Sequence, residues 1–196
     1  MEENIIRHDY KIGVNERRKA NGHNSFLIFF TGLSGSGKST LANALEQKLV
    51  KENIRTYTLD GDNVRKGINK DLSFSPEDRS ENNRRIGEVA NLFVDAGMIV
   101  LAAFVAPFEK DRNSIKEAVG NENYVEVFVN TSLQECERRD VKGLYKKARK
   151  GEIKDMTGIS SPYEVPLRPD IILTETESVE DAVSRIYELI RPKLQL

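Results

Sequence analysis

The chain has 196 residues and a formal net charge of −1, because 30 Lys and Arg nearly balance 31 Asp and Glu. The length fits one domain, and the charge balance argues against a protein that binds nucleic acid. The chain has 1 Cys, which excludes an internal disulfide framework and suits a reducing compartment. No apolar run reaches the roughly 18 residues of a membrane span, and the N-terminus lacks the apolar core of a secretory signal. We therefore expect a cytoplasmic protein that does not associate with membranes.

Apolar runs of strand length alternate with amphipathic segments along the chain. A polar segment, residues 1–24, precedes the apolar run FLIFF at 26–30, which is typical of a strand buried on both faces of a parallel sheet. Further strands are expected at 56–60, 98–107, 124–130 and 170–174, and helices at 39–52, 76–96, 111–119, 131–139 and 178–190. This alternation predicts an α/β domain over residues 25–196, with a mostly parallel sheet flanked by helices.

The clearest motif is GLSGSGKS at residues 32–39, which satisfies G-x-x-x-x-G-K-S/T. It follows the first predicted strand and opens a predicted helix. Its glycines let backbone N–H groups turn towards phosphate oxygens, and the helix N-terminus adds positive potential. We expect Lys38 to reach the β- and γ-phosphates of a nucleotide and the Ser39 hydroxyl to bind Mg²⁺. The predicted ATP-binding residues are Gly32, Leu33, Ser34, Gly35, Ser36, Gly37, Lys38, Ser39 and Thr40.

A phosphate loop occurs in both GTPases and kinases, and a second motif favours a kinase. A GTPase should carry N-K-x-D, but NKDL at 69–72 has Leu72 in place of the aspartate. The LDGD sequence at 59–62 instead puts two carboxylates at the C-terminal end of a predicted strand, where parallel sheets bind ligands. Asp60 can hold Mg²⁺ through water, and Asp62 can orient or deprotonate an attacking hydroxyl. The candidate catalytic residues are Lys38, Asp60 and Asp62, and the candidate metal ligands are Ser39 and Asp60.

Four blocks in chain order resemble the adenylylsulfate kinase family, also called adenosine 5′-phosphosulfate kinases. They are GLSGSGKST, LDGDNVRKGINKDLSFSPEDRSENNRRI, FVAPFEKDR and DVKGLYKKARKGEIKDMTGISSPYE. The likeness extends from about residue 21 to the last predicted helix. It implies a P-loop kinase fold, Mg²⁺ dependence and commonly a homodimer. It also implies transfer of the ATP γ-phosphate to the 3′-hydroxyl of adenylylsulfate, which gives 3′-phosphoadenylylsulfate and ADP in sulfate assimilation.

The same resemblance implies an acceptor site for adenylylsulfate, formed by Asp62, Arg65, Phe74, Arg79, Asn82, Val105, Lys142, Asp155 and Met156. Their chemistry suits the ligand, because an aromatic ring can stack on adenine and three cationic side chains can neutralise a phosphosulfate. Without the family match, Phe74 would be interpreted as a core residue, and Arg79 and Asn82 as parts of a solvated helix face.

A basic segment follows, with eight Lys or Arg against two acidic residues between Arg138 and Lys154. We interpret residues 142–166 as a lid that closes on the nucleotides and excludes water, with Gly143, Gly151 and Gly158 as hinges. The alternative interpretation is a solvated basic helix face.

One residue departs from the family pattern. Many members read F-I/V-S-P, and the serine has been assigned as a phosphorylated intermediate, whereas residues 104–107 here read FVAP. Ala106 has no hydroxyl to phosphorylate, so we expect direct, in-line transfer between ATP and the acceptor. Two alternatives stay open: another small-acceptor P-loop kinase, such as one for a nucleoside or a sugar, or a catalytically impaired nucleotide-binding homologue.

The remaining distinctive residues predict no further site. Cys136 is expected to be a buried structural thiol. His8 and His23 have no metal-ligand grouping and are expected at the surface. The polar N-terminal segment can fold over the site or over a neighbouring subunit, and the sequence leaves that choice open.

Overall fold

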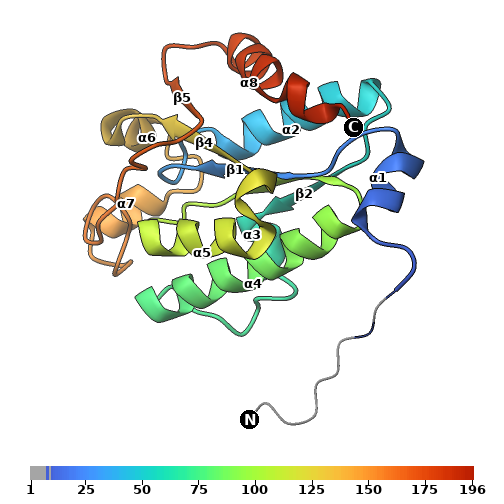
Figure 1. The fold of residues 1–196 in the computed structure, drawn as a ribbon. Helices are drawn as coiled ribbons and strands as arrows, with labels where there is room; N and C mark the ends of the chain where they lie inside the picture. Colours follow the sequence, from blue (N-terminus) through green and yellow to red (C-terminus); the bar gives the residue numbers. More distant parts are fainter. Residues whose placement is uncertain (1–7, 9) are drawn as a thin grey trace.

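A computed structural model describes residue 8 and residues 10–196 (Figure 1). Within these residues, five strands form one sheet in the order β2-β3-β1-β4-β5. The strands are β1 (Leu27–Thr31), β2 (Thr56–Asp60), β3 (Ile99–Ala103), β4 (Tyr124–Asn130) and β5 (Ile171–Thr174). Every pairing is parallel, so the C-terminal ends of all the strands meet at one edge, with β1 in the middle.

Helices cover both faces of this sheet (Figure 1). One face carries α2 (Lys38–Lys51) and α8 (Val179–Leu194), and the other carries α4 (Pro76–Asp95) and α5 (Glu109–Val119). The shorter elements are α1 (Val14–Asn21), α3 (Gly61–Arg65), α6 (Leu133–Arg139), α7 (Leu144–Arg149) and the 3-10 turn η1 (Asn121–Asn123). This architecture confirms the expected α/β fold. In the described part of the chain, no helix is both long and apolar enough to cross a membrane.

The central strand shows why the first apolar run is unbroken. Ile28 and Phe30 pack into the core layer under α2 and α8, whereas Leu27 and Phe29 pack into the layer under α4 and α5. None of these four side chains is measurably exposed. Because alternate side chains of a strand point to opposite faces, a strand covered on both faces is apolar at nearly all its positions.

The apolar run predicted as a strand over residues 98–107 is shorter in the structure. β3 ends at Ala103, and residues 104–107 form a loop at the edge of the sheet. Ala106 has a φ of +40°, a left-handed backbone that cannot continue a strand. α1 and α3 were not predicted, since helices of 8 and 5 residues are too short to show a clear period.

His23 corrects another expectation, because it is only 5% exposed. Its Nε2 accepts the backbone N–H of Arg55 at 3.0 Å, and its Nδ1 lies 2.7 Å from the carbonyl oxygen of Asn24. The imidazole therefore joins the segments that lead into β1 and β2. His8 is exposed and Cys136 is buried, as predicted.

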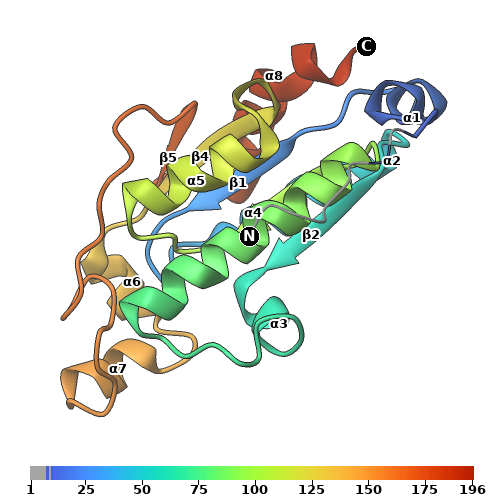
Figure 2. The ribbon, with the colours of Figure 1, turned by 60° about the horizontal axis from the view of Figure 1, so that its bottom comes forward.

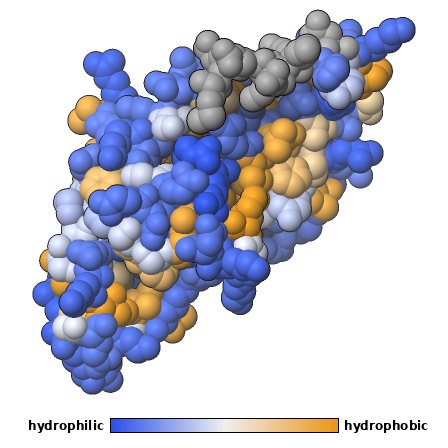
Figure 3. All heavy atoms as spheres, turned by 90° about the horizontal axis from the view of Figure 1, so that it is seen from below, coloured by the Kyte–Doolittle hydropathy of each residue, from blue (hydrophilic) through white to orange (hydrophobic). Residues whose placement is uncertain are grey.

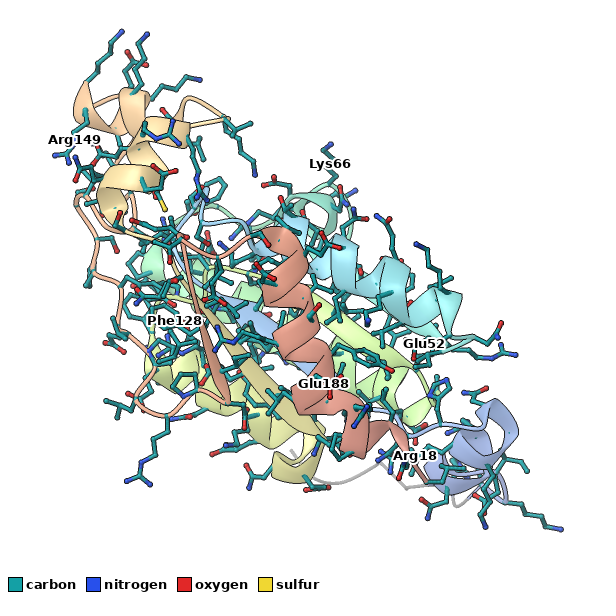
Figure 4. All side chains as sticks on the ribbon, turned by 90° about the horizontal axis from the view of Figure 1, so that it is seen from above. Arg18, Glu52, Lys66, Phe128, Arg149 and Glu188 are labelled. Carbon is teal, nitrogen blue, oxygen red and sulfur yellow. The ribbon has the colours of Figure 1, made fainter. Side chains whose placement is uncertain are left out.

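α1 lies at the edge where the strands begin. Arg17 donates to the carbonyl oxygen of Asp95 at 3.0 Å, and Asn21 donates to that of Gly97 at 2.8 Å. Figure 2 shows α1 at one end of the molecule and α3 and α7 at the other. Figure 4 shows Arg18 correspondingly far from Lys66 and Arg149. Residues 14–24 therefore do not cover the C-terminal ends of the strands.

Candidate active site

Residues 32–39 form a tight loop that connects the end of β1 to the N-terminus of α2. Gly32, Gly35 and Gly37 all have positive φ values. At Gly32, a Cβ would lie 2.5 Å from the carbonyl oxygen of Val129, so only glycine fits there. The loop thus ends at a helix N-terminus, as a phosphate-binding loop requires.

Lys38 folds back against this loop. Its Nζ donates to the carbonyl oxygens of Gly32 at 2.9 Å and Leu33 at 2.6 Å. The side chain is 8% exposed, and burial lowers the pKa of its ammonium group to about 8. Anionic phosphate oxygens in place of these neutral carbonyls would favour the charged form, since hydrogen bonds between ions are the stronger ones.

The two aspartates of the LDGD sequence face the phosphate loop. Asp60 ends β2, and its Oδ1 accepts the backbone N–H of Asp62 at 3.0 Å, which caps α3. Its Oδ2 accepts the hydroxyl of Ser39 at 2.6 Å. Asp62 forms an ion pair with the ammonium group of Lys142, which comes from the predicted lid. The structure therefore brings the two motifs and the basic segment together.

A cavity of about 460 Å³ lies between the phosphate loop, α3, α4, the end of β3 and the 141–157 segment. Eight of the nine predicted acceptor residues line it: Asp62, Arg65, Phe74, Arg79, Asn82, Val105, Lys142 and Met156. Asp155 does not, although its carbonyl oxygen accepts from Arg79 at 2.6 Å. From the phosphate loop, six predicted residues line the cavity: Ser34, Gly35, Gly37, Lys38, Ser39 and Thr40. Gly32, Leu33 and Ser36 lie outside that lining.

Two arginines and one aromatic ring line the part of the cavity that α3, α4 and the segment between them form. The guanidinium of Arg65 lies 4.4 Å from the ring centroid of Phe74. Arg79 donates to the carbonyl oxygen of Phe74 at 2.9 Å. Burial lowers the pKa of both guanidinium groups, which nonetheless stay charged. Phe74 is 63% exposed, so its ring is open to a ligand rather than packed in the core.

Asn69 is a site residue that sequence reasoning missed. It is fully buried, and its Nδ2 donates to Oδ1 of Asn82 at 3.0 Å. This bond fixes the amide of Asn82 at the cavity wall. Asn69 belongs to the NKDL sequence, which was considered only as a guanine-binding motif, and the sequence carries no signal of its burial against Asn82.

Comparison with known proteins agrees with this geometry. The family described as adenylylsulphate kinase matches residues 24–174. The adenylyl-sulfate kinase of Staphylococcus carnosus is 52% identical over 189 residues, which cover 96% of this chain and 95% of that protein. The chain belongs to the adenylylsulfate kinase family.

Solved structures of APS kinases extend the comparison. The APS kinase CysC of Mycobacterium tuberculosis, in complex with AMPPNP and APS, matches with a TM-score of 0.83 at 45% identity. The match covers 86% of this chain and 98% of the CysC chain. A hexameric APS kinase from Thiobacillus denitrificans matches with a TM-score of 0.67 at 29% identity. The match covers 88% of this chain and 30% of that longer chain. The predicted P-loop kinase fold and adenylylsulfate kinase activity are confirmed, and the roles of single residues stay predictions.

The pKa of Lys38 predicts that nucleotide binding takes up protons in mildly alkaline solution. With a pKa of about 8, Lys38 is mostly charged at pH 7 but loses its proton as the pH rises. A bound ATP analogue raises this pKa, so we expect uptake of about half a proton at pH 8 and nearly one at pH 9. Calorimetric titration in buffers of different ionisation enthalpy measures this number.

Lys48 provides the control, since it lies on the same helix, outside the cavity lining. Lys48→Met should leave the proton uptake of this adenylylsulfate kinase unchanged. Binding heats at pH 8 and pH 9 that do not depend on the buffer would contradict the prediction.

Proposed function

We propose that this adenylylsulfate kinase transfers the γ-phosphoryl group of ATP directly to the 3′-hydroxyl of adenylylsulfate, without a covalent intermediate at residue 106. The observation that carries the proposal is one shared cavity, lined both by residues of the phosphate loop and by the Arg65, Phe74 and Arg79 cluster. One enclosure can hold donor and acceptor with their reacting atoms in line, and phosphoryl transfer depends mainly on such positioning and on charge neutralisation.

Each charged group of the cavity has a role in this proposal. The phosphate loop binds the β- and γ-phosphates, and Lys38 exchanges its loop carbonyls for phosphate oxygens. Asp62 orients or deprotonates the 3′-hydroxyl, since its carboxylate, in the first turn of α3, lines the same cavity as the phosphate loop. Its ion pair with Lys142 couples the lid to the reacting hydroxyl.

Ser39 and Asp60 fit a magnesium ion. Their side-chain oxygens lie 2.6 Å apart, and both are hard oxygen donors of the kind Mg²⁺ prefers. Two protein oxygens are enough, because Mg²⁺ usually takes its other ligands from waters and substrate phosphates. When bound, the ion neutralises charge on the phosphates.

The acceptor end suits a nucleotide that carries a phosphosulfate. Phe74 offers an exposed ring for adenine, and Arg65, Arg79 and Lys142 offer cationic donors to the anionic group.

We assign residues 142–166 to a lid. Gly143, Gly151 and Gly158 support this assignment because their φ values of 66°, 77° and 88° suit hinge positions.

We also propose that the enzyme works in the cytoplasm, where ATP is available.

We further propose that the protein partner is a second copy of the chain. Leu92 is 70% exposed on α4, and Tyr57, 45% exposed on β2, stacks on Phe93. Figure 3 shows apolar surface gathered on the face that carries α4. The solvent side of α4 also carries both charge signs: Glu81, Arg84, Arg85 and Glu88. A surface with apolar residues and charges of both signs can be complementary to itself across a twofold axis.

Purified protein with ATP, Mg²⁺ and adenylylsulfate should form the 3′-phosphorylated product and ADP in equal amounts. With ATP alone, intact-mass measurement should find no phosphorylated protein, because Ala106 offers no nucleophile. Ala106→Ser should keep kcat within about threefold of the parent, since positioning rather than a hydroxyl carries the step. Absence of product, or a phosphoprotein that passes its phosphoryl group to the acceptor, would contradict the proposal.

Lys142→Ala should raise the KM for adenylylsulfate about tenfold and change the Kd of an ATP analogue less than about twofold. A lost charge-assisted contact of roughly 1.5 kcal/mol gives that ratio. Initial rates and calorimetry measure the two quantities. Lys146→Ala is the matched control, because Lys146 is exposed on α7 and does not line the cavity. Equal losses for both substrates would show that Lys142 has no preference for the acceptor.

Leu92→Glu should convert a dimer into a monomer, because it places a charge in the apolar surface between the two copies. Sedimentation velocity measures the mass in solution. Val50→Glu, which alters an exposed apolar residue of α2 on the opposite layer, should leave the dimer intact. A parent protein that sediments as a monomer, or equal effects of both variants, would reject this interface.

A further inference from the structure

We propose that Arg112 is a positioning residue for the acceptor: it holds the carbonyl oxygen of Ala106 and thereby fixes the 105–107 loop that forms one wall of the cavity. Arg112 does not line the cavity itself, whereas all three residues of the loop do. It therefore acts through the loop. This inference rests on the proposed function, because it takes the cavity as the adenylylsulfate site.

The 105–107 loop has a backbone conformation that its sequence does not favour. Ala106 has a φ of +40°, in the left-handed region where a Cβ crowds the following carbonyl oxygen. It is also 2% exposed, so solvent does not compensate its backbone groups. A residue other than glycine persists in such a conformation only where its surroundings hold it there.

Three successive carbonyl oxygens of this loop are held by three different parts of the fold. That of Ala106 accepts from Nη1 of Arg112 on α5 at 2.9 Å. The carbonyl oxygen of Val105 accepts from the Thr31 hydroxyl at the end of β1 at 2.7 Å. That of Pro107 accepts from the backbone N–H of Glu164 at 2.8 Å. The guanidinium is the charged donor of the three, and it holds the residue with the unfavourable φ. Charge-assisted hydrogen bonds are stronger than neutral ones.

Arg112 is itself fixed in place. It is 3% exposed, and its Nε lies 3.2 Å from Oε1 of Glu126 on β4. The ring of Tyr163 lies 5.9 Å from the guanidinium carbon. Because a guanidinium is planar and rigid, pairing one arm with Glu126 sets the direction in which the other arm meets the loop.

A purely structural role for Arg112 would consist of neutralising Glu126 in the protein interior. The two roles predict different results when Glu126 loses its charge. Glu126→Gln keeps an oxygen acceptor beside the guanidinium and leaves its bond to Ala106 in place. Arg112→Met with Glu126→Gln removes both charges together, so no unpaired charge is left in the interior.

The experiment compares KM values for both substrates in the full-length enzyme. Glu126→Gln should keep both KM values within about twofold of the parent. Arg112→Met/Glu126→Gln should raise the KM for adenylylsulfate about tenfold, with the KM for ATP still within about twofold. That ratio corresponds to the loss of roughly one charge-assisted hydrogen bond. Arg112→Lys keeps a positive charge beside Glu126 but lacks the second N–H arm that donates to Ala106. It should also raise the KM for adenylylsulfate, and it tests the proposal if the double variant unfolds.

Ala106→Gly completes a double-mutant cycle with these changes. Glycine adopts a positive φ without the Cβ penalty, so the loop should then depend less on Arg112. In the Ala106→Gly background, the loss of Arg112 should raise the acceptor KM less than about threefold. Positioning through residue 106 requires this non-additivity.

Three outcomes separate the possibilities. A parent enzyme without turnover defeats the proposed function. An active Arg112 variant that keeps the parent's acceptor KM, or whose KM rises equally for both substrates, defeats the positioning role alone. Effects of Arg112 and Ala106 that simply add would also overturn it, because the guanidinium would then act elsewhere than on the loop.

Discussion

The carboxylate of Asp60 joins the two halves of the site. In the sheet, β3 lies between β1 and β2, so the phosphate loop and the LDGD sequence start from strands that are not neighbours. Asp60 connects them: one oxygen accepts the Ser39 hydroxyl from the first turn of α2, and the other caps α3 through the Asp62 N–H. The distance between the phosphate loop and α3 depends on this bridge. A shift of β2 relative to β1 would break the bond to Ser39, whereas the cap on α3 is local and would move with β2.

The cationic groups of the cavity are all paired with oxygens of the protein itself. Lys38 donates to carbonyl oxygens of the phosphate loop, and Arg79 to a carbonyl at Phe74 and to another at Asp155. Lys142 pairs with Asp62. Partly buried charges need such partners, because an unpaired charge in the interior is costly. We therefore expect anionic substrates to replace the neutral carbonyl partners of Lys38 and Arg79 with charged oxygens, so that binding gains from stronger bonds rather than from newly ordered side chains. A net charge of −1 gives no sign of this local arrangement.

The fold was predictable wherever one physical constraint acted on many residues at once. β1 is buried on both faces, so residues 27–30 are all apolar, and β2 follows its predicted range to the residue. The phosphate loop was predictable because Gly32 meets the carbonyl oxygen of Val129 and tolerates no side chain.

Prediction failed where a single long-range contact decides the conformation. His23 is buried because it accepts a backbone N–H of Arg55, 32 positions along the chain, and no local pattern reports that bond. Asn69 supports Asn82 across a loop and a helix turn. β3 ends at Ala103 although the apolar run continues to residue 107, and that run does not encode the left-handed φ of Ala106. At this last position the backbone, rather than the side chain, makes the contacts that shape the cavity. A loop held by its carbonyl oxygens keeps its form when a side chain changes. A family pattern with serine at this position and this chain with alanine can therefore share one acceptor wall.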